Sequence, residues 1–429
     1  MSWLLISLLL MVCLWLVGSG LRRPGGIYEF PFLAGATFLG FLLPQLPGLA
    51  TDPYLPAIAF EKMVFFTILC AVAMGVGWTS GAKPINAGKW AFDQQVLLWI
   101  AAGLSLIGAF FSYKIDQLPP EMTVLSSQWT GLPVAYLFFA RVKIYGFAIA
   151  ALCFARNPSR FAFTIILFNM MYILQNVVLH GRRADTSEFL LIVALSVWFA
   201  RGKALPRTVA VIGIMVGTLF IHSVGDYRSL SSQNDLNTST VLQIGWVNNL
   251  LSLVKNGGAE AKNAVVHIHH IDQYMEFDYG ASNWNILVFN YVPAQLFGSE
   301  FKESLYIPIS PQGDPYYDAP GGATNTGMLD AFASFWYFGF VKFFFAAYFV
   351  SRIYYSAKMG SFMFQILYMV SLTPALHVIT HHTQTLPSAW VHMALFLLPS
   401  LALAKIKAPS KLSLGNMEAR KVSGKVGIR

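Results

Sequence analysis

The chain has 429 residues, of which 56% are hydrophobic and only 11% are charged, whereas soluble domains carry about 25% charged residues. This composition excludes an ordinary soluble globular protein and is typical of a chain whose solvent is lipid. The net charge of +9 would suggest a nucleic-acid partner in a soluble protein, but here the basic residues must first be tested as topology signals.

The chain begins with an apolar segment that Arg22 and Arg23 follow rather than precede. A signal peptide carries its basic residues ahead of the apolar stretch, so we expect a retained first span that ends in the cytoplasm. Further segments match the roughly 20 apolar residues that a membrane helix needs. The eleven predicted spans are residues 2–20, 28–48, 59–79, 93–112, 133–155, 161–179, 187–200, 208–224, 328–351, 361–379 and 389–405.

Basic residues alternate between the loops that connect these spans. One set of loops is basic, and the other set is acidic or rich in proline. Because cytoplasmic loops collect Lys and Arg, we predict an all-α integral membrane protein with eleven transmembrane helices, N-terminus out and C-terminus in. The predicted regions are helices 1–8 in residues 1–224, a large structured periplasmic loop with amphipathic helices in 225–327, helices 9–11 in 328–405 and a basic cytoplasmic tail in 406–429.

Arg182 and Arg183 stand in an outer turn, where this charge bias leaves basic residues scarce. A guanidinium group stays charged and offers a planar fork of donors that matches a phosphate. We therefore interpret the turn as a binding site for a lipid-borne phosphate at headgroup depth. The alternative is a pair of interfacial arginines that reach lipid headgroups or pair with Asp185 and Glu188.

Two further groups of charges are candidates. The outer end of the eighth span carries His222, Asp226 and Arg228. These residues form either a base with a nearby cation or a polar helix end in which Asp226 pairs with Arg228. Arg141 and Lys143 lie in the fifth span, some ~12–15 Å deep at 1.5 Å per residue. Cations inside a membrane are costly and usually face a cavity or a partner, so Arg141 is a functional candidate.

Histidines gather in two stretches, namely His267, His269 and His270, and His377, His381, His382 and His392. The first stretch has the spacing of metal ligands, but no Glu completes a metalloprotease helix signature, and an acid/base or sugar-binding role suits it better. The second stretch gathers around one outer turn and is a candidate for proton transfer near neutral pH. The three cysteines lie in apolar runs without CxxC spacing, so we expect no metal site.

Residues 310–340 combine a Pro/Gly/Asp loop with hydroxyl and aromatic side chains before the ninth span. Thr326 can cap this span and leave N–H groups free for an anion. Aromatic rings suit sugar contacts, although aromatics at this depth also form an interfacial belt. The candidate ligand contacts are Tyr316, Tyr317, Thr324 and Thr326.

The order of these motifs resembles the Wzy-type oligosaccharide repeat-unit polymerases of bacterial surface polysaccharide pathways. In that family a Gly-x-Arg turn recurs mid-chain. An Ile/Val-Pro pair, Gly-Gly, Thr-x-x-Gly and an aromatic residue followed closely by Gly recur near the last large outer loop. The matching positions are 181–183, 292–293, 321–322, 324–327 and 337–339, within residues 130–345. The chain departs from the pattern in having Arg at both the second and the third position of Gly-x-Arg.

The resemblance implies a GT-C-like membrane glycosyltransferase of the bacterial inner membrane that works at the periplasmic face without a metal or another cofactor. Its substrates would be a polyprenyl-pyrophosphate-linked oligosaccharide donor and acceptor, as in O-antigen and lipopolysaccharide biosynthesis with undecaprenyl pyrophosphate. Membrane lipid and a chain-length regulator protein would be further partners, and nucleic acid would not be one.

The residue types fit that chemistry, because arginines can bind the pyrophosphate and stabilise the charge that develops when the glycosidic bond breaks. We assign this role to Arg182, Arg183 and Arg228, with Arg141 as a deeper helper. The attacking hydroxyl needs a base, for which Asp226, His222 and His180 are candidates.

Three other functions are compatible with the sequence. An O-antigen ligase would use the same donor and the same arginines. A transporter or flippase of lipid-linked sugar would need charged residues in several spans, but deep charges are few here. A membrane-bound acyltransferase would need a catalytic His in a buried span, and His377 is the residue that keeps this alternative open.

Overall fold

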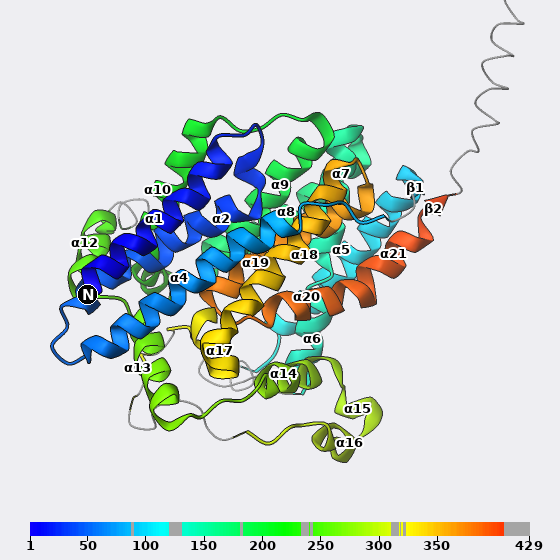
Figure 1. Ribbon diagram of the computed structural model, residues 1–429. Coiled ribbons are helices and arrows are strands. Elements are labelled where there is room, and N and C mark those ends of the chain that lie inside the picture. Colours follow the sequence, from blue (N-terminus) through cyan, green and yellow to red (C-terminus); the bar gives the residue numbers. More distant parts are fainter. Residues whose placement is uncertain are drawn as a thin grey trace, which may run out of the picture.

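The computed structural model describes residues 1–86, 90–119, 131–180, 183–232, 240, 243–309, 317, 319–320 and 323–406. Side chains are described for these residues except 176–184, 228–229, 231–232 and 295. The described chain is a bundle of helices with one short antiparallel strand pair (Figure 1), so the predicted all-α class is confirmed.

The first half of the chain supplies most of the bundle (Figure 1). Its elements are α1 (Ser2–Leu21), η1 (Gly26–Tyr28), α2 (Phe30–Thr37), η2 (Phe38–Leu42), η3 (Leu43–Gln45), α3 (Leu46–Ala50), α4 (Ala57–Ser80), β1 (Ala91–Phe92), α5 (Gln94–Asp116), α6 (Leu132–Ala140), α7 (Lys143–Arg156), α8 (Arg160–His180), α9 (Arg183–Arg201) and α10 (Arg207–Ser232).

The second half begins with helices outside the bundle and then returns to it (Figure 1). Its elements are α12 (Trp246–Asn256), α13 (Ala259–Tyr274), α14 (Ala281–Tyr291), α15 (Ala294–Phe297), α16 (Ser299–Ser304), α17 (Gly327–Phe335), η5 (Trp336–Gly339), α18 (Phe340–Lys358), α19 (Phe362–Thr380), α20 (Thr385–His392), η6 (Met393–Leu397), α21 (Leu398–Leu403) and β2 (Lys405–Ile406).

Nine helical segments of the described chain are long and apolar enough to cross a membrane, as in a multi-pass membrane protein. Two of the predicted spans are not among them. The apolar described part of α8 is only Arg160–Gln175, and α9 carries two acidic and two basic residues. The predicted count of eleven spans therefore stays a prediction.

The bundle has two ends that differ in what they carry. At one end β1 pairs with β2, and the Arg201 Nε donates to the Ala155 carbonyl oxygen at 3.1 Å. At the other end Lys262 pairs with Asp52 at 3.2 Å, and the helices α12 to α16 lie here. We call these the basic end and the loop end, because Arg and Lys side chains gather at the first and residues 243–309 at the second.

Two predicted spans are interrupted. The fifth breaks between α6 and α7 at Arg141 and Val142. The ninth is not one helix, because α17 ends at Phe335 and the next residue, Trp336, has a left-handed φ of 53°. A Cβ on Gly339 would lie 2.0 Å from the Ala331 carbonyl oxygen, so only glycine lets the chain turn this closely back onto α17.

The centre of the bundle is formed by α4, α18 and α19. The window of α19 that could span a membrane is 83% buried, the highest share of the nine. Tyr354 of α18 and Tyr368 of α19 are fully buried, with ring centroids 4.9 Å apart. Lipid tails are as apolar as these side chains, so close van der Waals packing rather than apolar transfer holds such a core together.

Candidate functional site

A cavity of about 570 Å³ lies between α5 to α9, α14, α19 and α20, towards the loop end of the bundle. We call it the Arg141 cavity. Charged side chains of both signs line it, although most of the surrounding helices are apolar. These side chains are Asp116, Arg141, Lys143, Asp185 and Glu188. A cavity that combines an apolar lining with a few charged groups is the usual form of a ligand site.

The break between α6 and α7 places Arg141 in this cavity. The α6 helix begins at Leu132 with Pro133 in its first turn and ends at Ala140, and α7 restarts at Lys143. Arg141 is exposed to the cavity and makes no hydrogen bond or ion pair with any residue that the structure describes. Its guanidinium is therefore available to an anionic ligand.

Lys143 is held differently although it lines the same cavity. Its Nζ donates to the Ser112 Oγ at 2.9 Å and lies 5.5 Å from the centre of the Tyr172 ring. The start of α7 packs closely on α5, since a Cβ on Gly108 would lie 2.6 Å from the Lys143 Cβ. Lys143 therefore contributes positive charge to the cavity from a fixed position.

The charge of Arg141 acts on Glu188, Tyr291, His377 and His392, which come from four different helices. Tyr291 is the member of this group outside the spans. Burial raises the pKa of its hydroxyl, and the Arg141 charge and a backbone hydrogen bond act against that increase. The cavity therefore surrounds Arg141, a cation without an ion-pair partner among the described residues, with groups that can donate or accept protons.

Hydrogen bonds fix the orientation of His392. Its Nε2 lies 2.8 Å from the Phe138 carbonyl oxygen, which can only accept, so Nε2 carries the hydrogen. The Nδ1 atom then accepts from the Tyr145 hydroxyl at 2.5 Å. These two bonds connect the helices on either side of the Arg141 break to α20, and they hold this part of the cavity in place.

The last turn of α14 closes the cavity at the loop end. Phe289 and Tyr291 line it, and the Tyr291 hydroxyl donates to the Ser388 carbonyl oxygen of α20. The Lys302 Nζ donates to the Phe289 carbonyl oxygen at 2.9 Å. The loop-end helices are thus part of the cavity and are not merely attached to the bundle.

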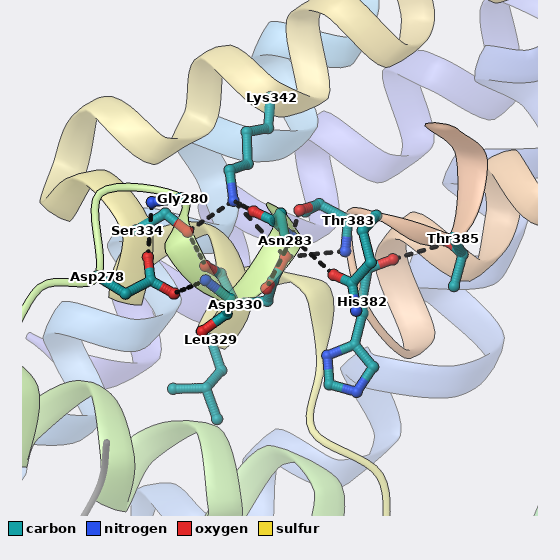
Figure 2. A network of polar contacts seen from close by, with 12 residues as sticks. Asp278, Gly280, Asn283, Leu329, Asp330, Ser334, Lys342, His382, Thr383 and Thr385 are labelled. Carbon is teal, nitrogen blue, oxygen red and sulfur yellow. Dashed lines mark hydrogen bonds and ion pairs between the residues drawn. The ribbon is translucent and has the colours of Figure 1, made fainter. Parts of the chain in front are cut away.

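A buried polar network, which we call the Lys342 network, holds the first turn of α14 (Figure 2). The Lys342 Nζ donates to the Asn283 Oδ1 at 2.5 Å and to the Ser334 Oγ at 2.7 Å. Its ion pair with Asp330 spans 3.8 Å, and Asp330 also accepts from the Thr383 backbone N–H at 2.9 Å. The network joins α14, α17, α18 and the turn between α19 and α20, so it positions the helix that closes the cavity.

Several predicted site residues lie outside what the structure describes. Arg182 and Tyr316 are not described at all. His180, Arg183 and Arg228 belong to described helices, but their side chains are not described. Asp185, two residues after Arg183, lines the Arg141 cavity, so the helix that begins in the two-arginine turn borders the cavity.

His222 and Asp226 do not line the Arg141 cavity. The His222 Nε2 is 2.8 Å from the Gly40 carbonyl oxygen, and Asp226 accepts from the Asn249 Nδ2 at 2.6 Å. Both contacts arise because α10 packs against η2 and α12. Neither of these two predicted bases therefore lies at the Arg141 cavity.

The described hydroxyl candidates near the ninth span make hydrogen bonds within the protein. The Thr324 Oγ1 donates to the Thr380 carbonyl oxygen at 2.9 Å, and the Tyr317 hydroxyl donates to the Asn263 Oδ1 at 2.7 Å. Thr326 caps α17 as expected and is fully buried. A Cβ on Gly327 would lie 1.7 Å from the Val378 carbonyl oxygen. Thr324 and Gly327 therefore fix α17 against α19, and none of the described members of this motif lines the Arg141 cavity.

Charged and polar side chains of the histidine-rich helix α13 contact other side chains of the protein. His270 lies 3.6 Å from Glu276, and Asp272 pairs with Lys62 and accepts from the Trp336 Nε1. Burial lowers the pKa of His269. Among the described residues no group of three or more His, Cys, Asp or Glu side chains is placed to hold a metal ion.

Tyr145, Tyr291 and Asp116 line the cavity, and the sequence did not single them out. Tyr145 follows Arg141 by four positions, about one helical turn, and that spacing is a signal that could have found it. Tyr291 and Asp116 carry no comparable signal, because they reach the cavity from elements distant in the chain.

The described chain is thus a predominantly helical protein whose longer helices could cross a membrane. It contains a cavity lined by charged side chains near the loop end. Comparisons with family models, curated proteins and solved structures found no match for the chain.

Proposed function

We propose that the protein is a membrane glycosyltransferase that joins polyprenyl-pyrophosphate-linked oligosaccharide repeat units into a surface polysaccharide, and that the Arg141 cavity is its active site. One observation carries the proposal. An arginine without a partner among the described residues faces a cavity that also borders the start of α9, directly after the two-arginine turn.

The cations of the cavity suit a pyrophosphate leaving group. Breaking the glycosidic bond leaves negative charge on the pyrophosphate. Arg141, which has no hydrogen-bond or ion-pair partner among the described residues, can stabilise this charge directly, and Lys143 adds positive charge from its position beside Ser112. Arg182 and Arg183, which precede Asp185 in the sequence, would add further donors to the lipid-borne phosphate. The resulting enzyme needs no metal in this role.

The carboxylates of the cavity suit the acceptor. An attacking sugar hydroxyl must give up its proton, and Glu188 lies where the charges of both Arg141 and Lys143 act on it. We therefore place the base on α9 at Glu188, with Asp185 near it, rather than on α10. His377 would then orient a sugar hydroxyl, whereas both ring nitrogens of His392 are engaged by Phe138 and Tyr145.

The proposed topology has eleven spans, with α8 and α9 as the two that carry polar residues into the membrane. Contacts at the two ends of the bundle support alternating directions for the helices. The basic end would face the cytoplasm of a bacterial inner membrane, and the loop end would face the periplasm. The Arg141 cavity would then open where lipid-linked repeats are polymerised.

The direct test supplies the purified protein with one lipid-linked repeat as its sole substrate. A polymerase produces a ladder of products, and we expect Arg141→Met to abolish the ladder while Arg160→Met, an exposed arginine at the opposite end, retains it. A wild-type protein that yields no ladder would contradict the proposal. A transfer product that forms only when a lipid A core is added would indicate a ligase instead, and movement of the lipid without a new bond would indicate a flippase.

A further inference from the structure

A second hollow lies on the other side of α20 from the Arg141 cavity. It has a volume of about 480 Å³ and lies between α18, α19 and the α20–α21 segment. Its lining is mostly apolar and aromatic. The residues that matter here are Tyr348, Phe349, Arg352, Phe364, Leu367 and Trp390. We call it the Arg352 groove.

The groove lies on a face of the bundle that is apolar and uncovered. Phe349 in its lining is 46% exposed, and its neighbours Phe345 and Leu395 are 50% and 53% exposed. In a helix that crosses a membrane, such side chains face lipid tails. The acyl chains of membrane lipids therefore contact this groove.

Among the described residues that line the groove, Arg352 is charged and no carboxylate accompanies it. It precedes Lys358, the last residue of α18, by six positions, which places it roughly 9 Å inward from the basic end. A cation at that depth is costly unless an anion or a polar group balances it.

The protein itself satisfies this guanidinium only in part. The Arg352 Nη1 donates to the Tyr348 hydroxyl at 3.0 Å, and the ring of Tyr348 lies 5.9 Å from the guanidinium carbon. The Nε atom is buried and has no hydrogen-bond partner among the described residues. A neutral hydroxyl leaves the charge unbalanced, so the missing group is an anion.

We propose that the Arg352 groove binds one anionic phospholipid from the leaflet at the basic end. Its phosphate pairs with the Arg352 guanidinium, and one acyl chain lies along the aromatic side chains towards Trp390. Basic pockets between membrane helices on this side suit anionic headgroups, and the apolar and aromatic lining of the groove suits a lipid tail. The site is separate from the proposed glycan chemistry and does not depend on it.

The groove adjoins the Arg141 cavity through a single side chain. Met393 lines both, from the π-helical segment η6 in the middle of the last span. Trp390 in the groove donates its Nε1 to the Ser371 Oγ at 3.0 Å, and the Ser371 Oγ lies 3.9 Å from the Met393 Sδ. A lipid in the groove would therefore stabilise the helix that forms one side of the cavity.

Native mass spectrometry of the full-length protein tests the proposal, with phosphatidylglycerol and phosphatidylcholine of identical acyl chains as probes. We expect phosphatidylglycerol to be retained about tenfold more strongly, as expected for a charge-assisted contact. Arg352→Gln should remove this preference. Arg207→Gln, an exposed arginine at the same end, should keep it. Equal retention of the two lipids, or equal loss in both variants, would overturn the proposal.

Two further variants keep the proposal testable if the Arg352→Gln protein does not fold. Arg352→Lys should retain most of the preference, because it keeps the charge. Leu367→Trp should fill the groove and weaken phosphatidylglycerol binding although Arg352 is intact. The headgroup alone, as glycerol 3-phosphate, should not bind measurably. Binding of glycerol 3-phosphate as strong as that of the lipid, or full lipid binding by Leu367→Trp, would exclude a groove that holds an acyl chain.

Discussion

Arg141 and Lys342 are both cations near the loop end of the bundle, and their surroundings are opposite. Lys342 is only 19% exposed and is saturated by Asn283, Ser334 and Asp330 (Figure 2). Arg141 is exposed to a cavity and has no hydrogen-bond or ion-pair partner among the described residues. A satisfied cation holds helices together, whereas an unsatisfied one can bind a ligand. Within this one region, Lys342 therefore has a structural role, and Arg141 is the candidate for ligand binding.

The largest effect should come from Lys342→Met. Removing the lysine leaves Asp330, which is 8% exposed, without its counter-charge, and such a loss typically costs about 3–5 kcal/mol. The free energy of unfolding in detergent should fall by that order, as measured by thermal or denaturant unfolding. The double variant Lys342→Met with Asp330→Asn should recover part of the loss. A Lys342→Met protein as stable as the wild type would show that the network does not hold α14.

Arg141→Met should lower the rate of the reaction and leave the stability of the protein almost unchanged. Without buried partners to lose, its stability should change by no more than about 0.5 kcal/mol. Its rate of repeat-unit transfer should fall by about 10²–10³-fold, the usual effect of removing one donor to a developing charge. Rates of ladder formation and melting temperatures measured on the same preparations check both parts. Equal damage to stability and rate would remove the contrast with Lys342.

The position of the base gives the third test, which sharpens the assignment of the cavity. We expect Glu188→Gln to lower the rate by at least about 10²-fold, as for loss of a general base. Asp226→Asn, at an exposed residue bonded to Asn249, should leave the rate within about twofold, because surface changes are worth little. The reverse result would return the base to Asp226 on α10, which is one of the three candidates that the sequence offers.

The smallest effect is expected at Gly339, in the turn that precedes α18 and Lys342. Gly339→Ala would place a Cβ against the Ala331 carbonyl oxygen and should cost about 1–3 kcal/mol of stability. Gly213→Ala in α10 is the matched control, because its Cβ would meet nothing within 4 Å. Unfolding experiments on both proteins measure the difference. Should the two variants prove equally stable, the close approach at Gly339 would have no energetic weight.

The candidate site could be predicted in part. Arg141 was found because a charge deep in an apolar run is costly and demands a reason. His377 and His392 were found as members of an outer cluster. Glu188 was seen only as a possible salt-bridge partner, and Tyr291 was not seen, because α14 reaches the cavity through the Lys342 network. His222 and Asp226, two of the predicted bases, lie away from the cavity, since α10 places them beside Gly40 and Asn249.

The sequence by itself determined that the chain is helical, that its apolar segments are long enough for a membrane, and which end of the bundle is basic. These properties follow from local composition, because a membrane helix satisfies its own backbone and needs only length and hydropathy. Only the tertiary structure decided which charges are satisfied. Lys342 and Arg141 look alike along the chain, and partners 59 positions from Lys342, such as Asn283, saturate one cation and leave the other exposed in a cavity.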